Sequence, residues 1–350
     1  MNTFRNRNNR AALFFILSAM FLPLSLPAQI ERRAIEASLS FLASDALEGR
    51  EAGRRGGLIA AEYIRAELKQ IGIKPLYNGY FQSFEAYAGA EKRGIEAPKT
   101  YYVHPDSIAK YKSERFYHRI NLQNVIGIIE GEKNDEFIVA GAHYDHVGVD
   151  ETLVGDQIYN GADDNAASVA ALLEIARVFV AKGIKPHRSI IFAFWDGEEV
   201  NYLGSEYFAT NFQLQNAIKA YINFDMIGRE GLMPIVYPDF AIPEATAENT
   251  VSGNEFHLLY SPELTSASQK LLDDIKDLNI KAKTGVLGHP SSGSDFLSFS
   301  LRKIPFIWFF TGLHPDYHTP DDEIETVDLE KVTEIAKAAY LLIKQLAEEK

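Results

Sequence analysis

The sequence contains no cysteine among its 350 residues. Disulfides, thiolate nucleophiles and cysteine-bound zinc are therefore excluded, and so is a lipid anchor attached to an N-terminal cysteine. Stability has to come from a large apolar core, which a chain of this length can supply. Basic residues are also few, because 35 Lys and Arg face 48 Asp and Glu, a net charge of −13. This balance argues against nucleic acid as a partner, since that affinity rests on basic side chains that neutralise phosphates.

Long apolar runs are confined to the N-terminus. Residues 11–24 are almost wholly apolar and follow three arginines without any acid, the pattern of a secretory signal peptide that ends at Ala28. An uncleaved N-terminal anchor is the alternative. Removal of residues 1–28 leaves 322 residues with a net charge of −16, because three positive charges are lost. No later stretch approaches the length of a membrane span, so we expect an exported protein, periplasmic or secreted, with no stable membrane insertion of the mature chain.

Residues 29–350 show no internal repeat or low-complexity linker and are predicted to form one domain. Helical spacing marks 33–43 and 57–71, whereas 81–119 is polar and irregular and is expected to form an excursion or an edge hairpin. Residues 230–262 lack a clear period and are expected to form surface loops. The predicted strands are Val125–Ile129, Phe137–Ala140, Ser189–Phe194, Ala220–Phe224 and Pro305–Phe310. The predicted helices among them are Ala166–Ala181, Ser205–Asn211, Ser266–Leu278, Ser294–Leu301 and Leu329–Leu346. This alternation predicts an α/β fold with a mostly parallel central sheet that helices cover on both faces.

Side chains that can bind metals follow four of these strands, close to the point where each strand ends. They are His143 and Asp145, Glu198 and Glu199, Asp225, and His318. Ligands gather at the carboxyl ends of strands in such sheets, so we expect these side chains at one edge. Asp163 is added from the loop before the next helix. Two histidines and three carboxylates suit two zinc ions that share one carboxylate.

Each of these motifs also has a purely structural interpretation. A His-x-Asp motif at 143–145 can occur by chance, and residues 163–165 (Asp-Asp-Asn) could cap the helix that comes after them. Both interpretations can hold, with one of the two later residues capping while Asp163 reaches a metal. Asp225 ends an apolar strand, where an unpaired carboxylate is costly, so it needs a cation. Arg229 is the alternative partner for it.

This set of residues indicates a hydrolytic chemistry. Two zinc ions can acidify a bridging water to a hydroxide nucleophile, while one of them polarises a scissile carbonyl. A carboxylate that binds no metal must take the proton and pass it to the leaving amine, and Glu198 is the candidate for this general base. Carboxylates also outnumber basic residues around the motifs, which favours a substrate with a free α-ammonium group.

Five motifs resemble those of the M28 family of zinc aminopeptidases. They are GAHYDHVG (141–148), NGADDNAAS (160–168), FWDGEE (194–199), INFDMIGR (222–229) and PDYHTPDD (315–322). The stretch FLASDALEGREAGRRG (41–56) is similar to secreted bacterial members. The resemblance implies a zinc-peptidase fold of the phosphorylase/hydrolase-like type over residues 29–350. It also implies an exported metallopeptidase with two Zn²⁺ per chain that removes the first residue of peptides with a free N-terminus.

The resemblance also implies a role for each site residue. His143, Asp163 and Asp225 would bind one zinc and Asp163, Glu199 and His318 the other, so that Asp163 bridges the two ions. Glu198 would be the general base, and Asp145 would orient His143 through its second ring nitrogen. Tyr317 would donate a hydrogen bond to the oxyanion, unless it only packs. The Asp163–Asp164 peptide bond would be cis.

Three further histidines and two segments of the chain give less information about the function. His146, His289 and His314 match no ligand position and are interpreted as rim or structural residues, while 289–295 resembles the family segment that lines the substrate pocket. Residues 81–119 are too short for the protease-associated domain that larger secreted relatives carry there, so access to the site should be less shielded. The alternatives are a glutaminyl cyclase-like acyltransferase, a non-catalytic binding protein on the same fold, and a carboxypeptidase of the same clan.

Overall fold

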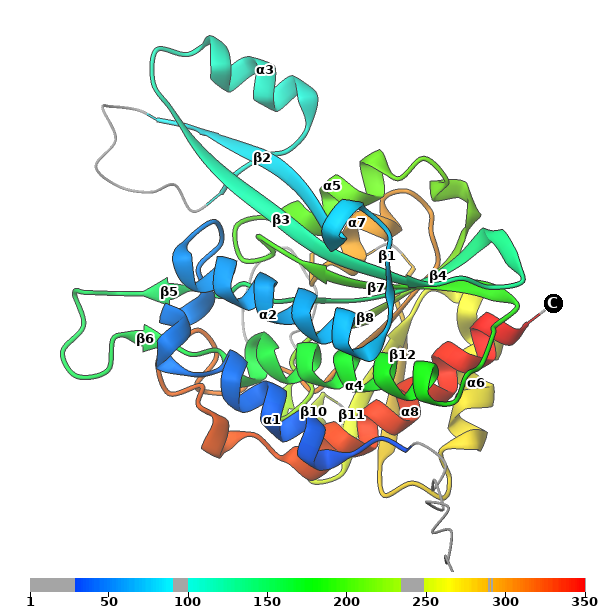
Figure 1. Cartoon of the computed structure of the whole chain (residues 1–350). Helices are drawn as coiled ribbons and strands as arrows, with labels where there is room; N and C mark the ends of the chain where they lie inside the picture. The colour runs from blue at the N-terminus through cyan, green and yellow to red at the C-terminus, as the bar shows by residue number, and fades with distance from the viewer. Residues whose placement is uncertain (1–28, 91–99, 234–248, 289, 291, 350) are drawn as a thin grey trace, which may run out of the picture.

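The computed structural model describes residues 29–90, 100–233, 249–288, 290 and 292–349, so the predicted signal peptide lies outside it. Its centre is a nine-stranded sheet in the order β1-β3-β7-β4-β8-β13-β11-β12, with β2 also paired to β3 (Figure 1). The strands of this sheet are β1 (Lys74–Pro75), β2 (Phe81–Gly89), β3 (Tyr117–Ile129), β4 (Lys133–His143), β7 (Arg188–Trp195), β8 (Ile218–Phe224), β11 (Glu255–Tyr260), β12 (Lys281–Val286) and β13 (Phe306–Phe310). Two short hairpins join β5 (Gly148–Val149) to β6 (Ile158–Tyr159), and β9 (Gly231–Leu232) to β10 (Thr250–Val251).

The four strands β7, β4, β8 and β13 lie next to one another at the centre and all run parallel. The strands β7 and β13 contain nearly continuous apolar runs, FAFW and FIWFF, and are buried along almost their whole length, whereas β4 begins with three exposed polar residues (133–135) before its buried apolar half. Strands of this composition are stable only when both faces of the sheet are covered. The prediction of a mostly parallel α/β sheet is therefore confirmed.

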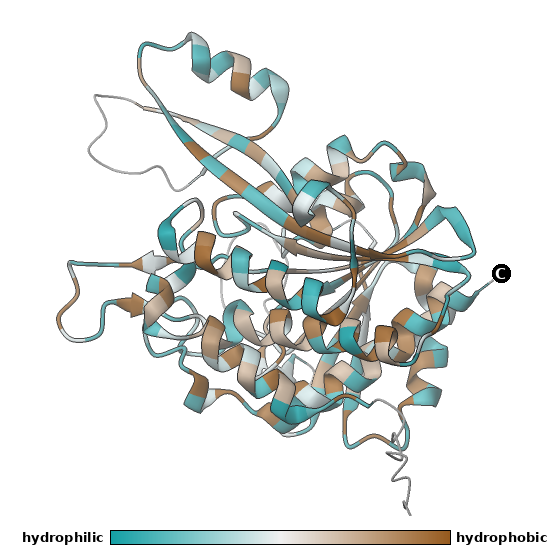
Figure 2. Cartoon of the chain, in the orientation of Figure 1, coloured by the Kyte–Doolittle hydropathy of each residue, from teal (hydrophilic) through white to brown (hydrophobic). Residues whose placement is uncertain are grey.

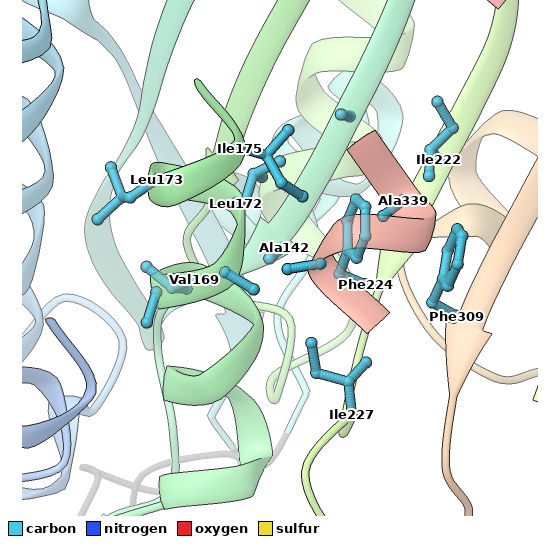
Figure 3. Packing of buried hydrophobic residues seen from close by; sticks show 14 of the residues in the cluster. Ala142, Val169, Leu172, Leu173, Ile175, Ile222, Phe224, Ile227, Phe309 and Ala339 are labelled. Carbon is cyan, nitrogen blue, oxygen red and sulfur yellow. The ribbon is translucent and has the colours of Figure 1, made fainter. Parts of the chain in front are cut away.

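Helices cover both faces of the sheet. They are α1 (Arg32–Leu42), α2 (Arg55–Ile71), α3 (Pro105–Ser113), α4 (Ser168–Ala181), α5 (Leu203–Asn211), α6 (Thr265–Asp274), α7 (Phe296–Ser300) and α8 (Leu329–Glu348). Apolar residues of α1, α2, α4, α6 and α8 form one core with one face of the sheet. Figure 3 shows Val169 and Leu172 of α4 near Ala142, Phe224 and Ala339 within this core. Residues of α5 and α7 form a second core on the opposite face, around Trp195 and Tyr221.

An arm made of β2, α3 and the first half of β3 projects from the body (Figure 1). It corresponds to the predicted excursion at 81–119, and the predicted strand Val125–Ile129 is the inner end of the longer β3. Helix α3 buries none of its residues and is largely hydrophilic (Figure 2). Within the described part of the chain, no helix has the length and apolar character needed to cross a bilayer.

The prediction of loops over 230–262 was wrong for its last part, because Glu255–Tyr260 form β11. This strand pairs antiparallel with β13 and parallel with β12. The strand β12 was also not predicted. Its apolar residues Phe256 and Leu258 are buried in the core that α6 and α8 share with the sheet. The predicted helix Ser294–Leu301 is shorter in the structure, where α7 spans only Phe296–Ser300.

Candidate metal centre

The parallel strands deliver the candidate ligands to one edge of the sheet. His143 is the last residue of β4, Glu198 and Glu199 come after the end of β7, and Asp225 comes directly after β8. His318 lies beyond β13, in a turn that follows the irregular stretch with Thr311 and His314. Because these four strands are neighbours, segments far apart in the sequence meet at their carboxyl ends.

Among the described residues, two groups of ligand-type side chains share Asp164, and a third group that could also hold a metal ion joins His143 to Glu198 and Glu199. In the first, Nε2 of His143 lies 3.3 Å from Oδ1 of Asp164 and 3.5 Å from Oδ1 of Asp225. In the second, Nε2 of His318 lies 3.1 Å from Oδ2 of Asp164 and 3.0 Å from Oε2 of Glu199. The ligand atoms of each group lie within 4.8 Å of one another. The two oxygens of Asp164 thus face different groups, which is how one carboxylate bridges two ions.

The structure places Asp164, not the predicted Asp163, in the ligand groups. Oδ1 of Asp163 accepts a hydrogen bond of 2.6 Å from the amide of Gly228, and Oδ2 lies 3.5 Å from Nε2 of His314. Asp163 therefore faces away from His143 and His318. The prediction of Asp163 as the bridging ligand is corrected accordingly, because adjacent residues in this turn point in different directions. The cis peptide bond is likewise Asp164–Asn165, one residue later than predicted.

The backbone around Asp164 is held from two sides. The carboxylate of Asp322 accepts hydrogen bonds from the amides of Asp163 (3.1 Å) and Asp164 (3.0 Å). The side chain of Asn165 donates to the carbonyl of Phe224 at the end of β8 and accepts from the amide of Met226. Neither Asp164 nor Asn165 caps α4, whose N-cap residue is Ala167, so that part of the prediction was wrong. These contacts instead fix Asp164 beside Asp225.

Several buried ligand atoms have no hydrogen-bond partner among the described residues. They are Nε2 of His146, Oδ1 of Asp225 and Nε2 of His318. Buried polar atoms are nearly always hydrogen-bonded, so a cluster of unpaired nitrogen and oxygen atoms calls for another partner. Imidazole nitrogen and carboxylate oxygen are ligands that zinc accepts. The residues present therefore fit a pair of zinc ions.

Burial and neighbouring carboxylates shift the pKa values of His318 and Glu198. Burial alone would lower the pKa of His318, but the carboxylates of Asp164 and Glu199 raise it to about 10. Burial raises the pKa of Glu198 well above its ordinary value, and the neighbouring Glu199 adds to this. Without a metal ion, His318 therefore carries a proton at neutral pH.

Asp145 lies behind the site and contacts both sides of it. Its carboxylate accepts hydrogen bonds from the amides of Glu198 (3.0 Å) and Glu199 (3.3 Å). Nδ1 of His143 lies 3.2 Å from the backbone oxygen of Asp145 and 3.8 Å from its carboxylate. The carboxylate thus fixes the turn that carries the two glutamates, in addition to standing near the ring it was expected to orient.

His146 belongs to the site, although the sequence suggested only a rim or structural position. It is buried, its Nδ1 lies 2.7 Å from Oε1 of Glu199, and it is part of the second ligand group. The only signal in the sequence is its place directly after the aspartate of the His-x-Asp motif. Arg229, the alternative partner of Asp225, instead pairs with Asp316 at 2.6 Å.

Three further candidates from the sequence have different surroundings. The ring of Tyr317 stacks on His318 with 3.8 Å between centroids. Burial, reinforced by the nearby carboxylates, raises the pKa of Tyr317, so its hydroxyl keeps a proton. His314 is buried, and its Nε2 lies 3.5 Å from Oδ2 of Asp163. His289 lies outside the described residues.

Two ligand groups that share a carboxylate, with a further glutamate beside them at the end of a parallel sheet, are typical of two-metal hydrolases. The model of peptidase family M28 matches residues 124–343. The chain belongs to peptidase family M28, as the motifs predicted.

Individual relatives are more distant. The rat aminopeptidase NAALADL1 is 29% identical over 241 residues, which cover 61% of this chain but only 29% of the rat protein. The structure of BSAP, a zinc aminopeptidase from Bacillus subtilis, covers 92% of this chain and 97% of its own, with a TM-score of 0.65 and 16% identity. The Bacteroides thetaiotaomicron glutaminyl cyclase covers 92% of this chain and 99% of its own, with a TM-score of 0.61 and 18% identity. At such identities, the two structures show that the fold is shared.

Proposed function

We propose that this protein is an exported di-zinc aminopeptidase that hydrolyses the N-terminal residue from peptides. The observation that carries the proposal is the pair of ligand groups that share Asp164, with Glu198 next to them. His143 and Asp225 would hold one ion and Glu199 and His318 the other, and Asp164 would bridge. His146, hydrogen-bonded to Glu199, would fix that carboxylate in place.

The chemistry divides between the ions and the side chains. Bound zinc supplies an acidified water and polarisation of the scissile carbonyl. Glu198 would take the proton of the attacking water and return it to the leaving amine. Asp145 keeps Glu198 in position through the backbone. Tyr317, which keeps its proton, would donate a hydrogen bond to the oxyanion.

The charge at the site favours cleavage at the amino end of the substrate. Asp145, Asp164, Glu198, Glu199 and Asp225 bring five carboxylates to this edge. Recognition of a terminal carboxylate generally needs a free arginine, whereas Arg229 is bound to Asp316. An α-ammonium group is attracted by the acidic field instead. This distinguishes the proposal from the carboxypeptidase alternative.

Cleavage should therefore require a free α-amino group. We expect leucine p-nitroanilide to be hydrolysed and N-acetyl-leucine p-nitroanilide to be inert, because acetylation removes the positive charge that the carboxylates attract. A leucyl tripeptide and its C-terminal amide should be cleaved at similar rates, which serves as the control. Equal turnover of the acetylated substrate would refute the aminopeptidase assignment and leave a zinc hydrolase of another specificity.

Zinc affinity should rise with pH. His318 has a pKa raised to about 10 without metal, so it carries a proton at neutral pH that zinc must displace. Each released proton makes binding about tenfold stronger per pH unit, up to the pKa of that group. Zinc titrations of the metal-free protein at pH 6, 7 and 8 would measure this slope. A flat profile would show that His318 is not a ligand.

A glutaminyl cyclase has the same fold, so cyclisation is the competing enzymatic activity. The two ligand groups that have Asp164 in common favour a two-metal hydrolase. Incubation with a glutaminyl peptide distinguishes the two activities, because a cyclase releases ammonia whereas an aminopeptidase releases free glutamine. Export to the periplasm or the medium is proposed from residues 1–28 alone, whose basic and apolar pattern is that of a signal peptide.

A further inference from the structure

Arg50 is a buried cation whose hydrogen bonds go to backbone carbonyls. It is 1% exposed. Its Nη1 donates to the carbonyls of Leu42 and Asn160 (both 2.6 Å), its Nη2 to Gly161 (3.0 Å) and its Nε to Tyr144 (2.8 Å). Among the described residues, no carboxylate accepts a hydrogen bond from it. Burial lowers its pKa to about 10, with the nearby carboxylates acting in the opposite direction, so it stays charged at neutral pH.

Three of the four carbonyls that Arg50 contacts belong to two of the loops that carry the ligands, and the fourth, that of Leu42, lies at the end of α1. Tyr144 is the residue after His143, and Asn160 and Gly161 lead directly into the turn that contains Asp164. The backbone oxygen of Arg50 also accepts a hydrogen bond of 3.2 Å from the amide of His146. One side chain therefore joins both loops behind the ligand groups.

The turn that carries Arg50, η1 (Asp45–Arg50), is fitted closely against the same loops. A Cβ at Gly49 would lie 2.2 Å from the carbonyl oxygen of Gly148, so only glycine allows this approach. Arg50 itself has a φ of 49°, a left-handed conformation that is uncommon outside glycine. Oδ1 of Asp45 accepts a hydrogen bond of 2.7 Å from the side chain of Asn160.

We propose that Arg50 is a positioning residue of the metal centre, which holds the His143 loop and the Asp164 loop at the spacing that lets their ligands share ions. The inference rests on the proposed zinc site. The buried charge needs counter-charges, and these are supplied by carboxylates near the site, Asp164, Asp145 and Glu199 among them. The segment that supplies this contact precedes residues 124–343, which match the family model.

The test is the zinc affinity of Arg50→Lys. Lysine keeps the charge, but its single ammonium group cannot reproduce the planar fork that reaches four carbonyls. Arg188→Lys is the matched control, because Arg188 also binds a backbone carbonyl and carboxylates but lies at the opposite end of β7. Zinc affinity is measured on the metal-free full chain by competition with a chelator, and circular dichroism checks that each variant is folded. When both variants are folded in the assay, a difference in their stability does not change the measured zinc affinity.

We expect Arg50→Lys to weaken zinc binding about 10- to 100-fold, the usual effect of losing a group that supports metal ligands. The cobalt-substituted variant should also show an altered absorption spectrum, which reports ligand geometry. Arg188→Lys should stay within about twofold of the natural protein, as expected for a site remote from the metal. Unchanged affinity in Arg50→Lys, or an equal loss in the control, would overturn the proposal.

Two further outcomes are separated by the same experiment. If the natural protein binds no zinc, the proposed zinc site fails, independently of Arg50. If Arg50→Lys does not fold, Asp45→Ala decides, because it removes only the hydrogen bond from Asn160 to an exposed side chain. We then expect zinc affinity to fall about two- to tenfold, the worth of one hydrogen bond. Natural affinity in Asp45→Ala would overturn the proposal.

Discussion

Glu198→Gln should lower kcat by ~10²–10⁴-fold while the protein keeps its zinc. The amide cannot accept the proton of the attacking water, yet it has nearly the same shape and keeps the backbone contact to Asp145. Substrate affinity should change little, because the lost interaction belongs to the transition state. The measurement is kcat and KM on leucine p-nitroanilide, together with the zinc content of the same preparation.

Glu199→Gln is the contrast for this experiment. Its carboxylate lies 3.0 Å from Nε2 of His318 and 2.7 Å from Nδ1 of His146, within the second ligand group. We expect this variant to lose a zinc ion together with activity. If Glu198→Gln lost zinc and Glu199→Gln kept it, the roles of general base and ligand would be reversed.

Asp164→Asn should weaken the binding of both ions, whereas Asp163→Asn should retain them. Asp164 belongs to both ligand groups, so loss of its negative charge weakens two sites at once. Asp163 accepts a hydrogen bond from the amide of Gly228, and an asparagine oxygen can do the same. Metal analysis after dialysis should give about two zinc ions per chain for the natural protein and Asp163→Asn, and below about one for Asp164→Asn, since a shared carboxylate serves both ions.

This pair of variants separates two assignments that differ by a single position. Zinc loss in Asp163→Asn with retention in Asp164→Asn would restore the assignment made from the motif alone. One ion per chain in the natural protein, with no gain of activity on added zinc, would contradict the two-metal proposal.

The apolar strands and the polar residues at their carboxyl ends could be predicted, because both depend on local sequence. A run such as FIWFF has to be buried on both faces, and a charged residue shortly after such a run marks the point where the chain leaves the core. His143, Glu198, Glu199, Asp225 and His318 were found by this reasoning, and the structure brings them together.

The features that could not be predicted depend on contacts distant in the sequence. The choice between Asp163 and Asp164 depends on Gly228, which lies far along the chain and whose amide binds the carboxylate of Asp163. His146 joins the site because Glu199 is folded against it, and β11 is a strand because β13 and β12 lie on either side of it. Arg50 looks like an ordinary charged residue until its four carbonyl partners are in place.

The chain order of the central strands has a consequence for how the protein matures. His143 and His318 are separated by 175 positions, and the sheet that unites them inserts β4 between β7 and β8 and places β13 beyond β8. Such pairings form late in folding, because the entropy cost of closing a long loop comes before the stabilising contacts between its ends are made. A nascent chain that ends before His318 can therefore offer only part of the ligand set. Metal loading is expected to be a final step that comes after completion of the polypeptide rather than a nucleus around which it folds.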